Sequence, residues 1–213
     1  MKWFLFCLLP MIPAAVRASS GNEAASDSSD FTIYIDFARP PSASAVRLMK
    51  GELHSIMAPL GMKFDWRQLS TADGHSAVLE LLVVRFRGAC QVDILPPRSN
   101  PGPLGWTHVS NGKILPFTDV DCDRIRELLA LHLAMAPRQE RPGLLGRAMA
   151  RVLAHELYHF LTNSTQHTSC GIAKRSYNAG DLSASALVFD PEGLEILREH
   201  APHLSGELTH GSP

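Results

Sequence analysis

The sequence carries almost no excess charge of either sign. Its 213 residues include 20 Lys and Arg against 21 Asp and Glu, which gives a formal net charge of −1. Proteins that bind nucleic acid need a concentrated basic surface, and an acidic tail is typical of proteins with basic partners. The composition therefore argues against a nucleic-acid partner and indicates a folded domain of a length that one hydrophobic core can serve.

The apolar stretch near the N-terminus is too short to cross a membrane as a permanent helix. It runs from Trp3 to Val16 after the basic Lys2, contains two prolines, and ends at Val16-Arg17-Ala18, where small residues occupy the positions that a signal peptidase reads. A polar linker follows, so we interpret residues 1–18 as a signal peptide rather than as a buried N-terminal helix. This predicts a secreted or periplasmic protein without a membrane anchor after signal removal.

The rest of the sequence predicts a flexible leader over 19–30, one α+β domain over 31–205 and a tail over 206–213. Apolar patterning predicts strands over 31–37, 62–69 and 77–86 and a hairpin over 105–120 around Asn111-Gly112. Helical spacing of apolar residues predicts helices over 45–60, from Asp119 or Asp121 through Leu133, over 142–161 and over 190–199, with loops over 87–105 and 162–179. In the second helix, the positions predicted to be buried are Ile125, Leu128, Leu129, Leu131 and Leu133.

The most informative pattern in the sequence is His155-Glu156-Leu157-Tyr158-His159. Two histidines four residues apart on a helix project from one face, one turn apart, so both imidazoles can bind the same cation. Glu156 can then take a proton from a zinc-bound water. Apolar residues surround the motif: Leu153, Leu157, Phe160 and Leu161. A solvated helix with two incidental histidines is the weaker alternative, because ionisable groups in apolar surroundings are costly without a partner.

A catalytic zinc site needs three protein ligands and one open position for water. His167 follows the motif after a Thr-Asn-Ser-Thr loop that can turn the chain back toward the metal, so it is the predicted third ligand. The alternative is an ordinary exposed loop histidine. Four other residues compete for the third position: Asp181, Glu192, Glu195 and Cys170.

At these residues the sequence resembles the zincin zinc metallopeptidases, and more closely the metzincin-like members. In those proteins an H-E-x-x-H helix ends at a turn and a third His follows shortly; the resemblance covers residues 148–177. The runs from His155 to His159 and from His167 to Lys174 are also similar to uncharacterised exported bacterial proteins. The sequence departs from the metzincin pattern, because Thr162 and Thr165 stand where that pattern has Gly and its third His, and no methionine follows the motif.

The resemblance implies an α+β zincin-like domain in which a small mixed sheet packs on helices, one of them the active-site helix. It implies a Zn²⁺ cofactor bound by His155, His159 and His167. It also implies that Glu156 is the catalytic residue of a metallopeptidase whose partner is a peptide or protein substrate. Another zinc hydrolase and a non-catalytic, zinc-stabilised secreted interaction domain are the alternative functions. Some endoribonucleases carry an H-E-x-x-H helix too, but the signal peptide and the absence of a basic surface argue against RNA.

The resemblance further suggests how a substrate is bound. The strand over residues 105–109 would pair with an extended peptide, main chain to main chain. Tyr177 or Lys174 would donate a hydrogen bond to the developing oxyanion. An ordinary hairpin strand and two surface side chains are the alternatives.

Four cysteines are present, and Cys7 lies in the predicted signal peptide. An oxidising compartment favours one disulfide among the other three. Cys90 closes a strand-like run and Cys122 begins a helix, so the sequence favours that pair without excluding the other two pairings. Cys170 is then a free thiol or lies close to the metal.

Overall fold

The computed structural model of the protein describes residues 31–72, 80–93 and 102–200. Within these residues the chain forms one mixed α/β domain with a five-stranded mixed sheet and six α-helices. The predicted signal peptide, leader and tail lie outside the described residues, as does the start of the strand predicted over 77–86. None of the helices in the described part has the length and apolar character of a membrane span.

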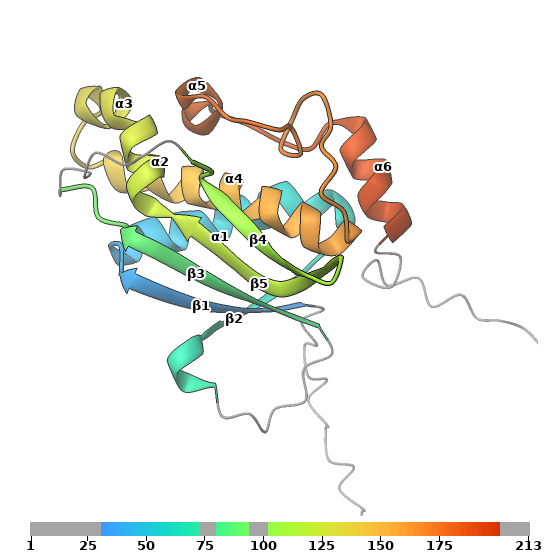
Figure 1. Cartoon of the computed structure of the whole chain (residues 1–213). Coiled ribbons are helices and arrows are strands. Elements are labelled where there is room, and N and C mark those ends of the chain that lie inside the picture. Colours follow the sequence, from blue (N-terminus) through green and yellow to red (C-terminus); the bar gives the residue numbers. More distant parts are fainter. Residues whose placement is uncertain (1–30, 73–79, 94–101, 201–213) are drawn as a thin grey trace, which may run out of the picture.

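The sheet has the strand order β2-β1-β3-β5-β4 (Figure 1). Its strands are β1 Phe31–Arg39, β2 Phe64–Gln68, β3 Leu81–Ala89, β4 Gly105–Ser110 and β5 Lys113–Asp121. All neighbours are parallel except β4, which runs antiparallel to β5 at one edge of the sheet. The β4–β5 turn lies at the predicted Asn111-Gly112, where both φ angles are positive, 51° and 75°, the backbone conformation that this pair favours.

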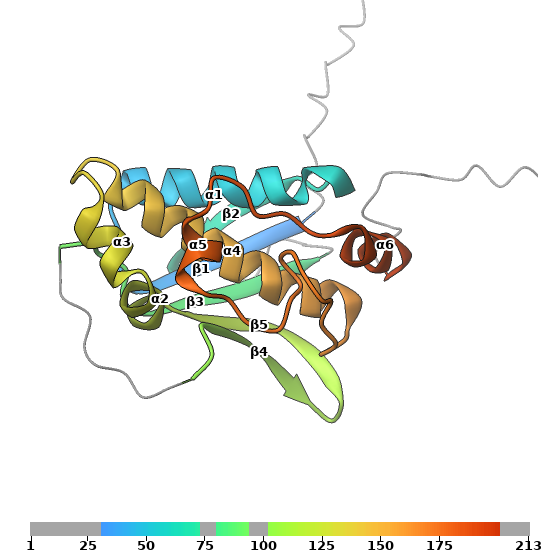
Figure 2. The ribbon, with the colours of Figure 1, turned by 90° about the horizontal axis from the view of Figure 1, so that it is seen from above.

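Two long helices, α1 (Ala43–Met57) and α4 (Arg141–Thr162), cover one face of the sheet (Figure 2). The β1 residues Phe31, Ile33 and Ile35 alternate along the strand and are at most 1% exposed, as expected for the face of a strand that packs on helices. Helix α1 lies against α4 closely enough that a Cβ added at Gly146 would come within 2.5 Å of the Ala45 carbonyl oxygen. This packing fixes the position of α4, which carries the motif predicted to bind a metal.

The helix predicted from Asp119 or Asp121 through Leu133 is two helices, α2 (Cys122–Leu128) and α3 (Ala130–Met135), so that prediction was wrong in part. Asp121 is the N-cap and accepts a hydrogen bond from the Arg124 amide. The helix is interrupted at Leu129, where ψ is 3°. After this interruption, the side chain of Leu131, which was predicted to be buried, faces solvent and is 68% exposed.

The segment after α4 contains one helix that the sequence analysis missed, α5 (Ala179–Ser183), before α6 (Pro191–His200). Asn178 caps α5 through a reciprocal capping box with Asp181. The signal was present in the sequence as an Asn followed three residues later by an Asp, a variant of the more familiar Ser/Thr and Glu/Gln box. Two short 3₁₀ helices complete the described elements: η1 (Ala58–Leu60) and η2 (Leu69–Thr71).

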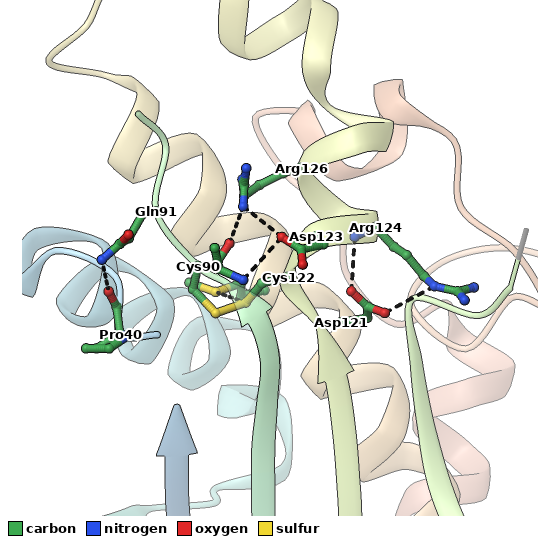
Figure 3. Close-up of a disulfide and its surroundings, with 10 residues drawn as sticks. Pro40, Cys90, Gln91, Asp121, Cys122, Asp123, Arg124 and Arg126 are labelled. Carbon is green, nitrogen blue, oxygen red and sulfur yellow. Dashed lines mark hydrogen bonds and ion pairs between the residues drawn. A yellow bond between two sulfur atoms is a disulfide. The ribbon is translucent and has the colours of Figure 1, made fainter. Parts of the chain in front are cut away.

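Cys90 and Cys122 are joined by a disulfide, the pairing that the sequence favoured. It links the end of β3 to the first residue of α2, and hydrogen bonds surround it (Figure 3). The Arg126 Nη1 donates to the Ala89 carbonyl at 2.6 Å and to Asp123 at 2.8 Å. The same junction is therefore held by a covalent bond and by a buried guanidinium. Cys170 is a free, exposed thiol.

Candidate metal centre

Helix α4 places His155, Glu156 and His159 next to β4, the strand at one edge of the sheet. The two histidines are 9% and 8% exposed, and Glu156 is 4% exposed. Because the histidines are one helical turn apart, their Nε2 atoms lie 3.0 Å from each other. The helix ends at Thr162, and Asn163 follows in the left-handed conformation with φ 45°, which reverses the chain toward the site.

The hydrogen bonds of these two histidines determine which ring nitrogen is free. The Nδ1 atom of His155 lies 2.8 Å from the Ile172 carbonyl, and that of His159 lies 2.7 Å from the Ser164 carbonyl. A carbonyl only accepts, so each Nδ1 carries a hydrogen and each Nε2 of a neutral ring offers a lone pair. Burial lowers the pKa of His155 to about 4 and lowers that of His159 too. Two lone pairs therefore face each other, an arrangement that a cation between them would stabilise.

His167 completes a group of three. Its ligand atom and those of His155 and His159 all lie within 4.8 Å of one another, close enough to hold a metal ion. The loop that carries His167 is closed by the amide of Thr168, which donates to the Ala173 carbonyl at 3.0 Å. Burial and the charge of Arg175 lower the pKa of His167, so all three rings favour the neutral, metal-binding form.

The four competing candidates for the third position lie elsewhere. None of them belongs to the group of potential ligands in the described residues. Asp181 makes an ion pair with Lys174 at 2.6 Å, and the thiol of Cys170 lies 3.5 Å from Asp190. Glu192 and Glu195 lie on α6.

Glu156 is almost enclosed, and its described hydrogen-bond partner is a side chain of β4. The Thr107 hydroxyl donates to Glu156 Oε2 at 2.7 Å. Burial raises the pKa of Glu156 to about 7, while the hydrogen bonds from Thr107 act in the opposite direction. A carboxyl group with a pKa near neutrality can both accept and return a proton at physiological pH.

A cleft of about 910 Å³ opens over these residues. Helix α4 supplies Val152, His155, Glu156 and His159 to it, and the loop after α4 supplies His167 and Tyr177. The opposite wall includes β4 residues Gly105, Trp106, Thr107 and Val109. The cleft thus lies between helix α4 and the edge strand β4, a position in which an extended ligand could pair with the strand.

The two candidate oxyanion-stabilising residues occupy different places. Tyr177 lines the cleft, with its ring centroid 5.7 Å from that of His155, and its hydroxyl donates to the Ile172 carbonyl. The same carbonyl accepts from His155, so Tyr177 takes part in orienting this candidate ligand. Lys174 is held in its ion pair with Asp181 and is not among the residues that line the cleft.

A buried arginine ties the loop region to α4. Arg151 lies one turn before His155, is 0% exposed, and makes an ion pair with Glu52 of α1 at 2.8 Å. Its Nη1 also donates to the carbonyls of Asp181 and Leu182 in α5. Arg151 was not among the residues predicted from the sequence, and Thr107 was predicted only as part of the strand that would pair with a peptide. The partners of these two side chains are 99 and 49 residues away along the chain.

Comparison with known proteins finds no matching family model, no similar curated protein and no similar solved structure. The site is therefore interpreted from its own geometry.

Proposed function

We propose that the protein is an exported, zinc-dependent metallopeptidase that hydrolyses peptide bonds. The observation that carries the proposal is the meeting of three neutral histidines with a buried glutamate of raised pKa in one cleft. Three imidazole ligands and one open position form the ligand set of a catalytic zinc site. Export is proposed from the N-terminal sequence alone.

The residues fit Zn²⁺ by the chemistry of their donors. Imidazole nitrogen is a good zinc ligand, and the Nδ1 hydrogen bonds of His155 and His159 direct both Nε2 lone pairs to one point. The ligand atoms of the three histidines lie within 4.8 Å of one another, so all three could share one ion.

When bound, Zn²⁺ would polarise the scissile carbonyl and make water more acidic. The Glu156 carboxylate would accept a proton from the attacking water at Oε1, because Oε2 already accepts the Thr107 hydrogen bond. It would then return that proton to the leaving amine. Its raised pKa suits both steps.

An extended peptide is the substrate that the cleft fits best. Strand β4 is an edge strand, paired with β5 on one side only, so the other side of its main chain is available to a further strand. Peptide pairing with this edge would lay the scissile bond along the helix residues that line the same cleft.

Metal analysis of the purified mature protein, beside a casein and a quenched-peptide assay, tests this function. We expect close to one zinc per chain and peptide cleavage that a chelator abolishes and added Zn²⁺ restores. If the protein binds zinc and hydrolyses a non-peptide substrate but cleaves no peptide, the peptidase function is wrong and the site belongs to another class of zinc hydrolase.

A further inference from the structure

Strand β4 holds the carboxyl group of Glu156 through one hydroxyl group. Thr107 Oγ1 lies 2.7 Å from Glu156 Oε2, and the glutamate is 4% exposed. In the part of the chain that the structure describes, Thr107 is the only side chain that donates a hydrogen bond to this carboxyl group. A buried carboxylate deprived of its donor is destabilised and free to rotate.

The direction of this hydrogen bond follows from the neighbouring hydroxyl group. Thr118 on β5 donates to the Trp106 carbonyl at 3.0 Å, and its oxygen lies 3.4 Å from that of Thr107. A hydroxyl has one hydrogen to donate, and a carboxylate only accepts. Because Thr118 donates its hydroxyl hydrogen to the main-chain carbonyl of Trp106, Thr107 is the hydroxyl that donates to Glu156.

The other carboxyl oxygen faces a position without a side chain. A Cβ added at Gly105 would lie 3.0 Å from Glu156 Oε1 and 2.8 Å from Val152 Cγ1. Gly105 and Thr107 are two residues apart on one strand, and both line the cleft. Thr107 therefore holds Oε2 through a hydrogen bond, and Gly105, which has no side chain, leaves the space beside Oε1 clear.

We propose that Thr107 is a positioning residue that fixes the rotamer of Glu156 so that Oε1 is presented to the cleft. The inference rests on the proposed function, because it assigns Glu156 as the general base. Thr107 acts through Glu156 and needs no contact with the substrate. Its removal should lower the rate of the chemical step and leave substrate binding nearly unchanged.

The kinetic test compares three variants of the zinc-loaded protein. Thr107→Val keeps the shape but removes the donor, Thr107→Ser restores a hydroxyl, and Thr32→Val removes a buried hydroxyl on β1 as a matched control. We expect Thr107→Val to lower kcat about 10-fold or more with KM changed less than about 2-fold. Thr107→Ser and Thr32→Val should keep kcat within about 3-fold of the wild type. A Thr107→Val protein with wild-type kcat, or a Thr107→Ser protein as slow as Thr107→Val, would overturn the proposal.

A second test needs neither metal nor activity. Urea unfolding of the metal-free wild type, Thr107→Val, Glu156→Gln and the double variant forms a double-mutant cycle. We expect the midpoint shift caused by Thr107→Val to change when Glu156 is Gln, because the two side chains are in contact. Additive shifts would overturn the proposed contact. If the wild type cleaves no substrate, the peptidase function fails, and this cycle still decides whether Thr107 holds Glu156.

Discussion

Two neighbouring residues of β4 contact two buried carboxyl groups whose pKa values move in opposite directions. Thr107 donates to Glu156 on the cleft side, and His108 Nε2 lies 2.6 Å from Asp119, which is 0% exposed. Burial raises the pKa of Glu156 to about 7. Burial alone would raise that of Asp119 as well, but hydrogen bonds from His108 and Arg87 and nearby arginine charge bring it below its ordinary value.

The two carboxyl groups differ in their hydrogen-bond partners. Asp119 has a guanidinium at 2.7 Å in addition to the imidazole, whereas Glu156 has one neutral hydroxyl. A charged donor stabilises an ionised carboxylate far more than a neutral one does. Asp119 is therefore suited to hold β3, β4 and β5 together, and Glu156 is suited to exchange a proton.

The largest expected effect comes from removing the proton acceptor itself. Glu156→Gln keeps the size and polarity of the side chain, so it should retain zinc and lose about 10²-fold or more of the peptidase rate. His159→Ala should lose zinc as well as activity, because it removes a ligand. Metal content and rate, measured on the same samples, separate the two. Loss of zinc from Glu156→Gln would show that Glu156 supports the metal instead.

The second prediction uses the pH dependence of the unfolding free energy of the metal-free protein to distinguish Glu156 from Asp119. A carboxyl group with a raised pKa binds more protons when folded, so the Glu156 contribution to stability falls as pH rises from about 4.5 to about 7. The histidines, whose pKa values are lowered, give a slope of the opposite sign. The wild type should therefore lose stability relative to Glu156→Gln over this window, by roughly 3 kcal/mol at most. Unfolding free energies at several pH values measure it, and a constant difference would contradict the raised pKa.

Asp119 should behave in the opposite way. Because its folded pKa is lowered, its contribution is fully present above its ordinary value of 3.8 and is lost as pH falls through the folded pKa. Asp119→Asn removes the charge that Arg87 and His108 share, and should cost about 1–3 kcal/mol of stability at neutral pH. The rate per folded, zinc-loaded molecule should stay near the wild-type value. Chemical unfolding and a peptidase assay on the same preparation check both statements, and a large loss of rate at full stability would place Asp119 in the catalytic machinery.

The smallest effect is expected at the exposed member of the Asp119 cluster. His108 is 38% exposed, and Arg87 remains with Asp119 after His108 is removed. His108→Ala should therefore lower the free energy of unfolding by about 1 kcal/mol or less. Thermal unfolding gives the value. A loss as large as that of Asp119→Asn would mean that the imidazole, and not the guanidinium, is the main partner of the buried carboxylate.

Local sequence accounts for much of the architecture. Alternation predicted β1, Asn111-Gly112 predicted the β4–β5 turn, and helical spacing after Pro142 predicted α4. These signals are local, since each depends on neighbours within one strand, one turn or one helical face. The helix predicted after Asp121 is interrupted at Leu129 and continues as the separate helix α3, so the prediction was wrong in its continuity.

The candidate site, too, depends partly on local sequence and partly on tertiary structure. The sequence by itself determined that His155 and His159 share one face of a helix with Glu156 beside them, because helical geometry fixes that relation. Only the tertiary structure decided that His167 joins them rather than Cys170 or a carboxylate, and that Thr107 donates to Glu156. It alone also gave Glu156 and Asp119 opposite pKa shifts. These outcomes depend on which distant strand and loop lie against the helix. The charges and hydrogen bonds around a side chain are set by its neighbours in the fold and not by spacing along the chain.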